Sequence, residues 1–370
     1  MKMCFFCCLY ESAGATETVY QYYLAGKRLG VDVSVAGFIA KNVAKWLPVL
    51  GKPERVREQY SDADWYPLNA SEANDIDLFV FYFDNDNILD PETDMDELEH
   101  IVRIVPRHKA IVIDADGKYN PVTKCKEGDF NHRDESAWKK WKFTFESLSD
   151  RIFQPSFRIT QPKVEFFPFF GYLDEEVESV EKTFNVLYLG NNWHRWDQIT
   201  EIIGYLNELR HLFPKIGIIG NNWLTGDEYW PEAKYREPQF FQERKIEVSE
   251  ERPHIGEVVS CMARAKYAPI LIRPILREMQ MITPRMYETF AARVIPIIPN
   301  DFFYYREIYG ALADELILGN APLERLADMV SRESYYRNVV REIREFLRSE
   351  HSFSARLQEL QNIQKEITSC

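Results

Sequence analysis

The sequence has no long apolar run. None of its 370 residues belongs to a stretch of about eighteen apolar residues, the length that a bilayer-spanning helix needs. We therefore expect no integral membrane association. The apolar segment after Met1 ends at Glu11 without a small-residue cleavage site, so it predicts a buried first strand rather than a signal peptide.

Cysteine is scarce and scattered. Three of the six cysteines lie in the first apolar segment, where alternate side chains point to opposite faces of a strand. A disulfide framework is therefore not expected, and no second C-x-x-C completes a zinc site with Cys4 and Cys7. These features favour a cytoplasmic protein whose cysteines act as small core residues.

Basic residues are outnumbered, with 45 Lys and Arg against 58 Asp and Glu and a net charge of −13. This balance argues against a nucleic acid or an anionic membrane as the main partner. The composition is otherwise that of a folded protein, with 45% hydrophobic and 14% aromatic residues. A length of 370 residues predicts two domains.

Short apolar runs alternate with helical periodicity, which is typical of α/β units around parallel sheets. The predicted strands are 3–9, 31–36, 78–83, 110–113, 184–189, 216–219, 268–272 and 294–298. Composition divides the chain into a first α/β domain over 1–165, a Phe/Pro-rich and acidic linker over 166–183, and a second α/β domain over 184–345. A terminal helix over 346–370 could pack back on the first domain. Ligands of such sheets bind at the carboxyl ends of strands, so a cleft between the two domains is expected.

The segment from Thr283 to Glu288 predicts a well-defined helix start, with Thr283 as N-cap and Pro284 at the first helical position. Free N–H groups at such an end favour an anion, and Arg285 adds a planar cation suited to phosphate. Glu288 could accept hydrogen bonds from the two hydroxyls of a ribose. The alternative is a solvated Arg285–Glu288 pair of little energetic weight.

Further donors follow two of the predicted strands. The turn after 184–189 contains Gly190, Asn192, His194 and Arg195, and Arg273 follows 268–272. Turn amides and these cations could bind a diphosphate. Alternatively, Gly190 and Asn192 only turn the chain, His194 is a surface residue, and Trp193 and Trp196 pack in the core.

Acidic turns follow two strands of the first half. Asp114 and Asp116 form a D-x-D after 110–113, as Asp84 and Asp86 do after 78–83. Such carboxylates could bind a divalent metal or act as a base, although Asp-rich turns end many strands and the turn interpretation is preferred for both. The loop after the first strand adds Glu11 as another base candidate. Further contacts of an acceptor or a diphosphate are expected from Ser12, Gly14 and Lys118.

The T-P-R-x-Y-E sequence of residues 283–288, with Tyr287 at its aromatic position, resembles the donor-binding half of the group 1 glycosyltransferases, specifically the CgeB-type spore-maturation glycosyltransferase-like family. The resemblance extends over 184–363 and is only general in the first half. It implies a GT-B fold of two Rossmann-like domains. It also implies that Glu288 binds the ribose of a nucleotide sugar.

Two departures from that family pattern are visible. Related retaining enzymes have a glutamate eight positions before Glu288, where this chain has Gln280, and no lysine accompanies Arg195 after 184–189. The expected function is transfer of a sugar from a UDP-, GDP- or TDP-linked donor to an acceptor hydroxyl, with no metal or other cofactor. Two alternatives stay open: an inactive binding protein of this fold, and a metal-dependent D-x-D transferase. Base, sugar, acceptor, stereochemical outcome and oligomeric state are not predicted.

Overall fold

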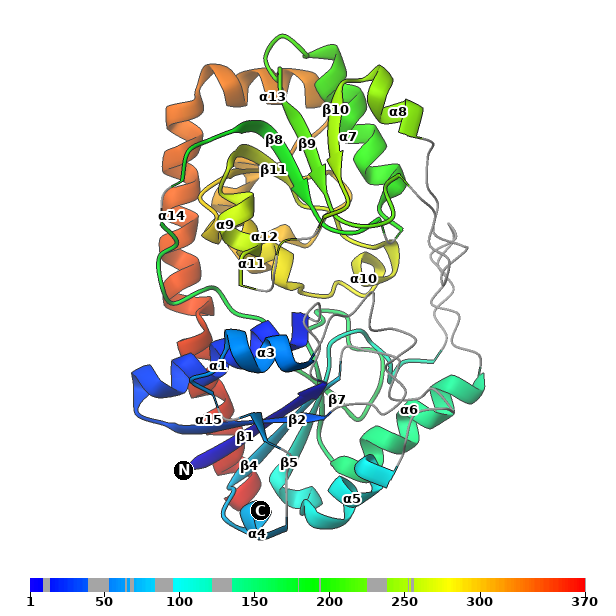
Figure 1. Ribbon diagram of the computed structural model, residues 1–370, viewed down its shortest axis with the longest axis vertical. Coiled ribbons are helices and arrows are strands. Elements are labelled where there is room, and N and C mark those ends of the chain that lie inside the picture. Colours follow the sequence, from blue (N-terminus) through cyan, green and yellow to red (C-terminus); the bar gives the residue numbers. More distant parts are fainter. Residues whose placement is uncertain are drawn as a thin grey trace. The chain divides into compact units, whose positions relative to one another are not determined.

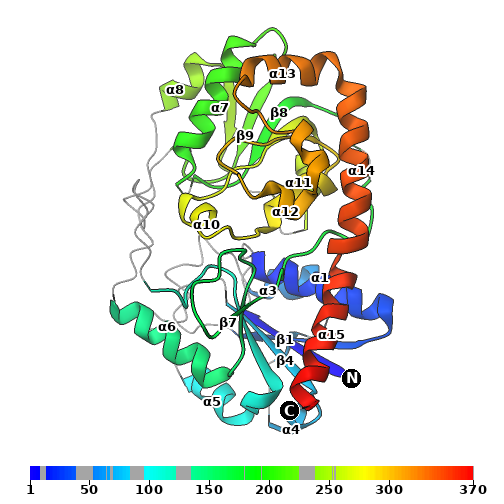
Figure 2. The ribbon, with the colours of Figure 1, turned by 180° about the vertical axis from the view of Figure 1, so that it is seen from behind.

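The computed structural model describes residues 1–8, 14–38, 53–63, 65–66, 70–83, 96–121, 135–178, 180–192, 194–224, 238–251, 253 and 256–369. These residues form two compact units. The first takes the described residues from Met1 to Asp174 and from His351 onward, and the second takes Glu175–Glu350. Each contains a parallel sheet with helices packed around it, as the sequence predicts (Figures 1 and 2).

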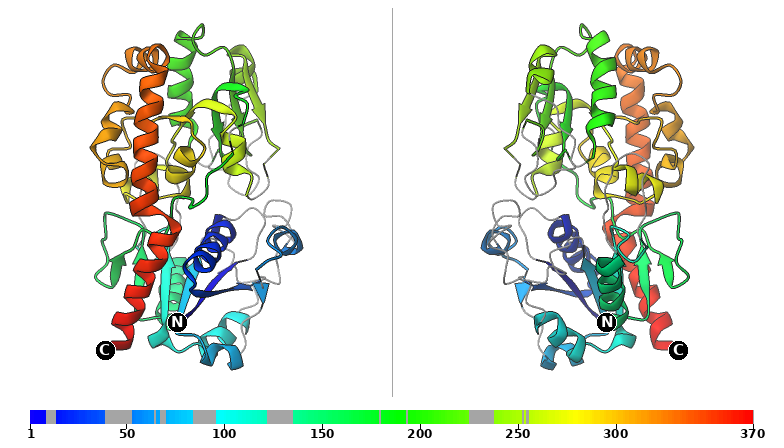
Figure 3. Two further views of the ribbon diagram at one scale, coloured as in Figure 1. Left: turned by 90° about the vertical axis from the view of Figure 1, so that its left-hand side faces the viewer. Right: turned by 90° about the vertical axis from the view of Figure 1, so that its right-hand side faces the viewer.

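Within the described residues, the first unit has a seven-stranded sheet in the order β3-β2-β1-β4-β5-β6-β7. Its strands are β1 (Lys2–Cys8), β2 (Asp32–Phe38), β3 (Trp65–Tyr66), β4 (Leu78–Phe83), β5 (Ala110–Asp114), β6 (Ile152–Gln154) and β7 (Val164–Phe166). Its helices are α1 (Gly14–Leu29), α3 (Pro53–Gln59), α4 (Ala70–Asn74), α5 (Asp96–Ile104), the 3-10 helix η3 (Arg107–Lys109), α6 (Glu135–Leu148) and α15 (Phe353–Ser369). Helices α1 and α3 lie on one side of the sheet and α5 on the other (Figures 1 and 3).

The central strands are almost continuously apolar because helices cover both faces of a parallel sheet. Phe5 of β1, Val80 of β4 and Val112 of β5 are all buried, as are Cys4 and Cys7.

The Phe/Pro-rich segment differs from its predicted role as a linker. Its first residue, Phe166, ends β7 of the first sheet, and Phe167, Phe169 and Phe170 are buried. The Tyr22 hydroxyl of α1 donates to the Phe169 carbonyl at 2.6 Å. Prolines exclude helix here, but the aromatic rings still form core, and the division between the units falls after Asp174.

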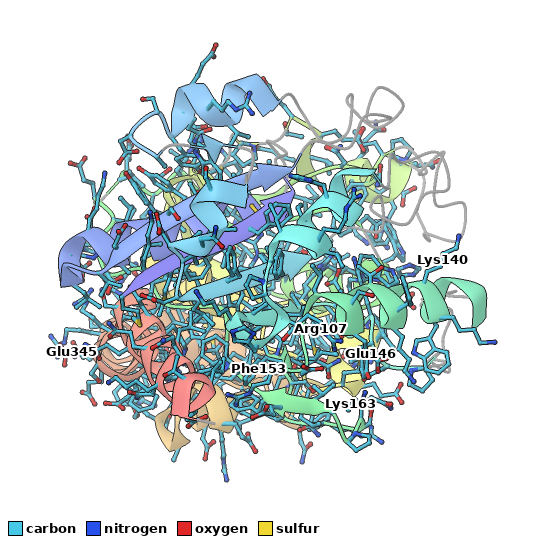
Figure 4. All side chains as sticks on the ribbon, turned by 90° about the horizontal axis from the view of Figure 1, so that it is seen from below. Arg107, Lys140, Glu146, Phe153, Lys163 and Glu345 are labelled. Atoms are coloured by element: carbon cyan, nitrogen blue, oxygen red, sulfur yellow. The ribbon has the colours of Figure 1, made fainter. Side chains whose placement is uncertain are left out.

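Helix α6 is joined by an ion pair to Lys163, the residue before β7. Lys163 Nζ lies 3.2 Å from Glu146 Oε1 (Figure 4). On the other side of this unit, α15 packs against α1, with the rings of Tyr22 and Phe353 5.3 Å apart.

The second unit has a five-stranded parallel sheet in the order β10-β9-β8-β11-β12 within the described residues. Its strands are β8 (Phe184–Leu189), β9 (Ile216–Ile219), β10 (Ile246–Ser249), β11 (Ala265–Pro269) and β12 (Ile295–Ile297). Its helices are α7 (Trp196–Glu208), α8 (Pro238–Glu243), α9 (Val258–Met262), α10 (Pro274–Glu278), α11 (Pro284–Ala291), α12 (Tyr305–Tyr309), the 3-10 helix η4 (Ala311–Glu315), α13 (Pro322–Ser331) and α14 (Glu333–His351, up to Glu350 in this unit).

Strand β11 begins and ends three residues earlier than the predicted strand over 268–272. Its register pairs Ala265 with Phe184 and Tyr267 with Val186. The buried residues Ile270, Leu271 and Ile272 continue the apolar pattern beyond the strand, so the pattern cannot mark where pairing stops. Arg273 is consequently the N-cap of α10 rather than a residue directly after the strand.

The chain passes between the units after Asp174 and again after Glu350, and both places are anchored. The Glu176 carboxylate accepts hydrogen bonds from Arg293, Arg344 and Arg348. Burial acts to raise the pKa of Glu176, but the arginines outweigh it and lower that pKa to about 2.

His351, the first residue after the second crossing, lies in a polar contact with Arg356. Its carbonyl accepts the Tyr172 amide at 2.7 Å. Burial and the Arg356 charge lower the pKa of the His351 imidazole to about 4.

Candidate functional site

The order of the second sheet places its ligand-binding edge. From β8 the chain adds β9 and β10 on one side, then returns to add β11 and β12 on the other. In open α/β sheets, ligands bind outside the carboxyl ends of the strands where this order reverses. The loops that follow β8 and β11 flank that point, and α11 is the helix that leads into β12.

The tetrapeptide G-N-N-W follows both β8 and β9, as residues 190–193 and 220–223. The described parts of the two turns are joined by hydrogen bonds. These run from Asn192 N to Asn221 O (2.9 Å), Asn192 Nδ2 to Asn222 O (2.9 Å), Asn221 N to Asn191 Oδ1 (3.0 Å) and Trp223 Nε1 to Gly190 O (2.7 Å). The duplicated motif therefore builds one rigid double turn, and the contact between its two copies is not predicted from the sequence.

Two glycines allow these turns to approach each other. A Cβ on Gly220 would lie 2.2 Å from the Gly190 carbonyl oxygen, and the Gly220 φ of +148° is itself a glycine conformation. Gly190 has a φ of +156°, and a Cβ there would meet the Tyr188 hydroxyl at 2.6 Å. Asn192 is fully buried, so it braces the double turn.

The residues after the first turn have different roles: His194 and Arg195 shape the turn, and Trp196 packs in the core. His194 has a φ of +53°, an uncommon conformation for a residue with a side chain, and Arg195 directs Nη1 to the Asn191 carbonyl at 3.2 Å. Trp196 is buried, with its ring centroid 6.0 Å from that of Trp223, which confirms the packing interpretation. Trp193 lies outside the described residues.

Helix α11 begins as the sequence predicts, with Thr283 as N-cap and Pro284 at the first helical position. Two buried tyrosines of the following segment hold this helix start. Tyr304 donates to the Met281 carbonyl and Tyr309 to the Met286 carbonyl, both at 2.9 Å. Burial raises the pKa of both tyrosines well above the usual value, so each stays a neutral donor.

Arg285 and Glu288 lie side by side on α11. Arg285 Nη1 is 3.5 Å from Glu288 Oε2, and the two side chains are 21% and 23% exposed. The ion pair weighed as the alternative is therefore present. Yet Arg285 Nη1 is buried and has no hydrogen-bond acceptor among the described residues, which leaves a charged donor for an external oxygen.

Two further candidates from the sequence lie in the loop before this helix and within the helix itself. Gln280 has a φ of +52° in the loop before α11. Tyr287 is 1% exposed, so its side chain belongs to the core rather than to a ligand contact.

A polar bridge that no sequence motif indicates supports the loop after β11. Gln198 Oε1 of α7 accepts the Ile272 amide at 3.1 Å, and its Nε2 donates to Asp301 Oδ2 at 2.8 Å. Arg277 forms an ion pair with the same carboxylate. The partners are far apart in sequence, so spacing carries no signal for them.

The turn after β5 carries the acidic candidates of the first unit. Asp114 is fully buried and accepts hydrogen bonds from the amides of Lys118 (2.7 Å) and Tyr119 (2.8 Å) and from Gln154 Nε2 (2.7 Å). These contacts favour the turn interpretation of Asp114 over that of a base. Asp116 is 30% exposed and stays available to a ligand.

Only some of the other site residues predicted in the first unit lie among the described residues. Gly14 opens α1, and its carbonyl accepts the Thr18 hydroxyl at 2.8 Å. Glu11, Ser12, Asp84 and Asp86 lie outside the described residues. Among the residues that are described, no group of three or more His, Cys, Asp or Glu side chains could hold a metal ion. Within the same residues, no helix has the length and apolar character to cross a membrane.

No family model and no curated protein matches the chain. Solved structures do match. An α-glucosyltransferase in complex with UDP and a 13-mer DNA is similar over 99% of both chains, with a TM-score of 0.62 and 12% identity. A glycosyltransferase from Rickettsia africae ESF-5 covers 99% of this chain and 98% of its own, with a TM-score of 0.57 and 10% identity.

The pneumococcal O-GlcNAc transferase GtfA, in complex with UDP and GlcNAc, is similar over 99% of both chains, with a TM-score of 0.54 and 9% identity. The chain has the GT-B fold. A GT-B fold consists of two Rossmann-like units, and the two parallel sheets predicted from the sequence are the sheets of these units. The double turn and α11 belong to the second of these.

Proposed function

We propose that this GT-B protein is a glycosyltransferase that moves a sugar from a nucleoside diphosphate donor to an acceptor hydroxyl. One observation carries the proposal. The N-terminus of α11 presents Arg285, whose buried Nη1 is ion-paired with a part-exposed Glu288 and has no hydrogen-bond acceptor among the described residues. A helix N-terminus with a cation suits the diphosphate, and a carboxylate one turn later suits ribose hydroxyls.

The remaining donor contacts are proposed around that pair. Arg195 and the amides of the double turn follow β8, and Arg273 caps α10. Each can contribute positive charge or N–H groups at the same edge of the sheet. His194 and Gln280, both with left-handed backbones at this edge, complete the proposed set.

The chemistry follows from charge placement. As the bond between sugar and diphosphate breaks, negative charge grows on the diphosphate, and fixed donors stabilise that transition state. No metal is needed in this proposal because arginines and helix amides supply the positive charge. UDP is the proposed donor nucleotide, supported by similar structures that contain UDP. The finer assignment to the CgeB-type family is part of the proposal.

Thermal shift measurements with UDP, GDP, ADP and TDP test the donor site. A nucleotide that binds only the folded protein raises its melting temperature. Glu288→Gln removes a charged hydrogen-bond acceptor, worth about 1.5–3 kcal/mol, so the dissociation constant should rise roughly 10- to 100-fold. The matched control is Glu324→Gln on the exposed start of α13, which should change nothing. If no nucleotide shifts the melting temperature, the donor site is refuted.

Gln280 supports a second candidate, a nucleotide-sugar-binding protein without turnover. Neutral Gln replaces the glutamate that the family resemblance leads one to expect at this position. Donor binding without hydrolysis or transfer to any acceptor would favour this candidate. A metal-dependent reaction through Asp116 is tested by chelation, since loss of transfer in EDTA and its recovery with Mg²⁺ or Mn²⁺ would support it.

A further inference from the structure

A buried lysine follows β5, at a place where lysine is ordinarily exposed. The Lys118 side chain is 1% exposed, and its Nζ lies 3.8 Å from Asp116 Oδ2 and 4.4 Å from the ring centroid of Trp141 on α6. Lysine is almost never fully buried unless it is paired, and the face of an indole attracts an ammonium group. The positive charge is thus fixed beside Asp116.

The turn that carries both residues is rigid. The buried Asp114 carboxylate accepts the Lys118 amide at 2.7 Å, and the Asn120 amide donates to the Gly117 carbonyl at 3.1 Å. Gly117 has a φ of +66°, a conformation that glycine adopts without strain. Asp116 and Lys118 are therefore held by the same closed turn.

Asp116 and Lys118 differ in exposure, and this difference decides which of the two a ligand can reach. The Asp116 side chain is 30% exposed, whereas that of Lys118 is 1% exposed. Two other carboxylates near this turn are engaged elsewhere. Asp114 accepts hydrogen bonds from the Lys118 and Tyr119 amides and from Gln154, and Glu146 of α6 accepts the Tyr119 hydroxyl and pairs with Lys163. A ligand can therefore reach the Asp116 carboxylate but not the Lys118 ammonium group.

We propose that Asp116 and Lys118 form the acceptor subsite of the transferase, with Lys118 as the positioning residue and Asp116 as the group that binds a hydroxyl of a neutral, sugar-like acceptor. This inference rests on the proposed function. Asp116 accepts a hydrogen bond from that hydroxyl, and the Lys118 ammonium holds the Asp116 carboxylate in position for it. An anionic acceptor meets the Asp116 carboxylate and is disfavoured.

Acceptor kinetics test the subsite with glucose and glucose 6-phosphate as a matched neutral and anionic pair. The donor is the sugar derivative of the nucleotide that gives the largest thermal shift. Asp116→Asn and Lys118→Met should each raise the acceptor KM about tenfold, with no further rise in the double variant and no change in donor KM. Lys163→Met, on the same unit, is the control and should match the wild type. Multiplying effects, a change in donor KM, or a preference for glucose 6-phosphate would overturn the proposal.

A second measurement does not depend on transfer. Urea unfolding of the wild type, the two single variants and the double variant measures how strongly Lys118 and Asp116 stabilise each other. A favourable coupling with no sugar transfer on any donor would refute the proposed function and leave the pair intact. A coupling of zero would refute the positioning role itself. If Lys118→Met does not fold, Lys118→Gln replaces it in both measurements.

Discussion

Gly220→Ala tests the double turn of the second unit. The new methyl carbon would lie 2.2 Å from the Gly190 carbonyl oxygen and 2.5 Å from its carbon, both backbone atoms. Backbone must therefore move, because no flexible side chain can give way. The φ of +148° adds strain for any residue with a Cβ.

The expected magnitude follows from these two contributions. Backbone strain costs about 1–3 kcal/mol, and overpacking a tight site costs a similar amount. A loss of about 3 kcal/mol corresponds to a fall of roughly 6–12 °C in melting temperature for a unit of this size. Because the Gly190 turn moves, nucleotide affinity should fall as well.

Gly204→Ala is the matched control in the same unit. This exposed glycine lies inside α7, and a Cβ there meets nothing within 4 Å. Alanine is favoured over glycine in a helix by about 0.5–1 kcal/mol, so this variant should melt slightly higher than the wild type and bind nucleotide equally. Differential scanning fluorimetry with and without nucleotide measures both effects. Equal melting of Gly220→Ala and the wild type would refute the contact between the two turns.

Two pH-dependent predictions concern the segments where the chain passes between the units. The pKa of His351 is about 4 in the folded protein against 6.5 ordinarily, so the unfolded chain binds more protons between these values and stability falls as pH drops from about 6.5 to about 4. His351→Gln should flatten the melting temperature over that range, and parallel curves for variant and wild type would contradict the assignment. The pKa of Glu176 is about 2 against 4.5, so its contribution is complete above pH 4.5 and is lost toward pH 2. Glu176→Gln should therefore lower the melting temperature at pH 7, and it should do so less in high salt. An unchanged melting temperature in low salt would show that the ion pairs of Glu176 with the arginines do not stabilise the fold.

Much of the fold could be predicted from local pattern. The β4, β8 and β9 bounds match the predicted strands, because continuous apolar runs with turn residues on both sides define a buried parallel strand. The start of α11 was equally readable from Thr283 and Pro284.

The sequence was less informative where packing decides. The apolar run at Ile270–Ile272 is buried beyond the end of β11, where the Ile270 amide still donates to the Ile297 carbonyl of β12 at 3.1 Å. The aromatic run at Phe167–Phe170 joins a core despite its proline. An apolar pattern predicts that a segment is buried, but it does not predict which segment packs against it.

The candidate site was predicted in its residue types and only partly in its geometry. Arg285 and Glu288 are adjacent, as expected of positions three apart on a helix. The burial of Tyr287 and of Lys118, and the bridge from Gln198 to Asp301, depend on contacts between distant segments. Lys118 was predicted to contact an acceptor or a diphosphate directly, but its side chain is 1% exposed and pairs with Asp116 instead.

Release of nucleoside diphosphate from a nucleotide sugar, with and without an added sugar acceptor, tests the central claim most directly. We predict that the wild-type protein releases UDP from a UDP-sugar faster when a neutral acceptor is present, and that Glu288→Gln lowers this rate by raising the KM for the donor. Tight nucleotide binding with no release of diphosphate from any UDP-, GDP-, ADP- or TDP-sugar would contradict it.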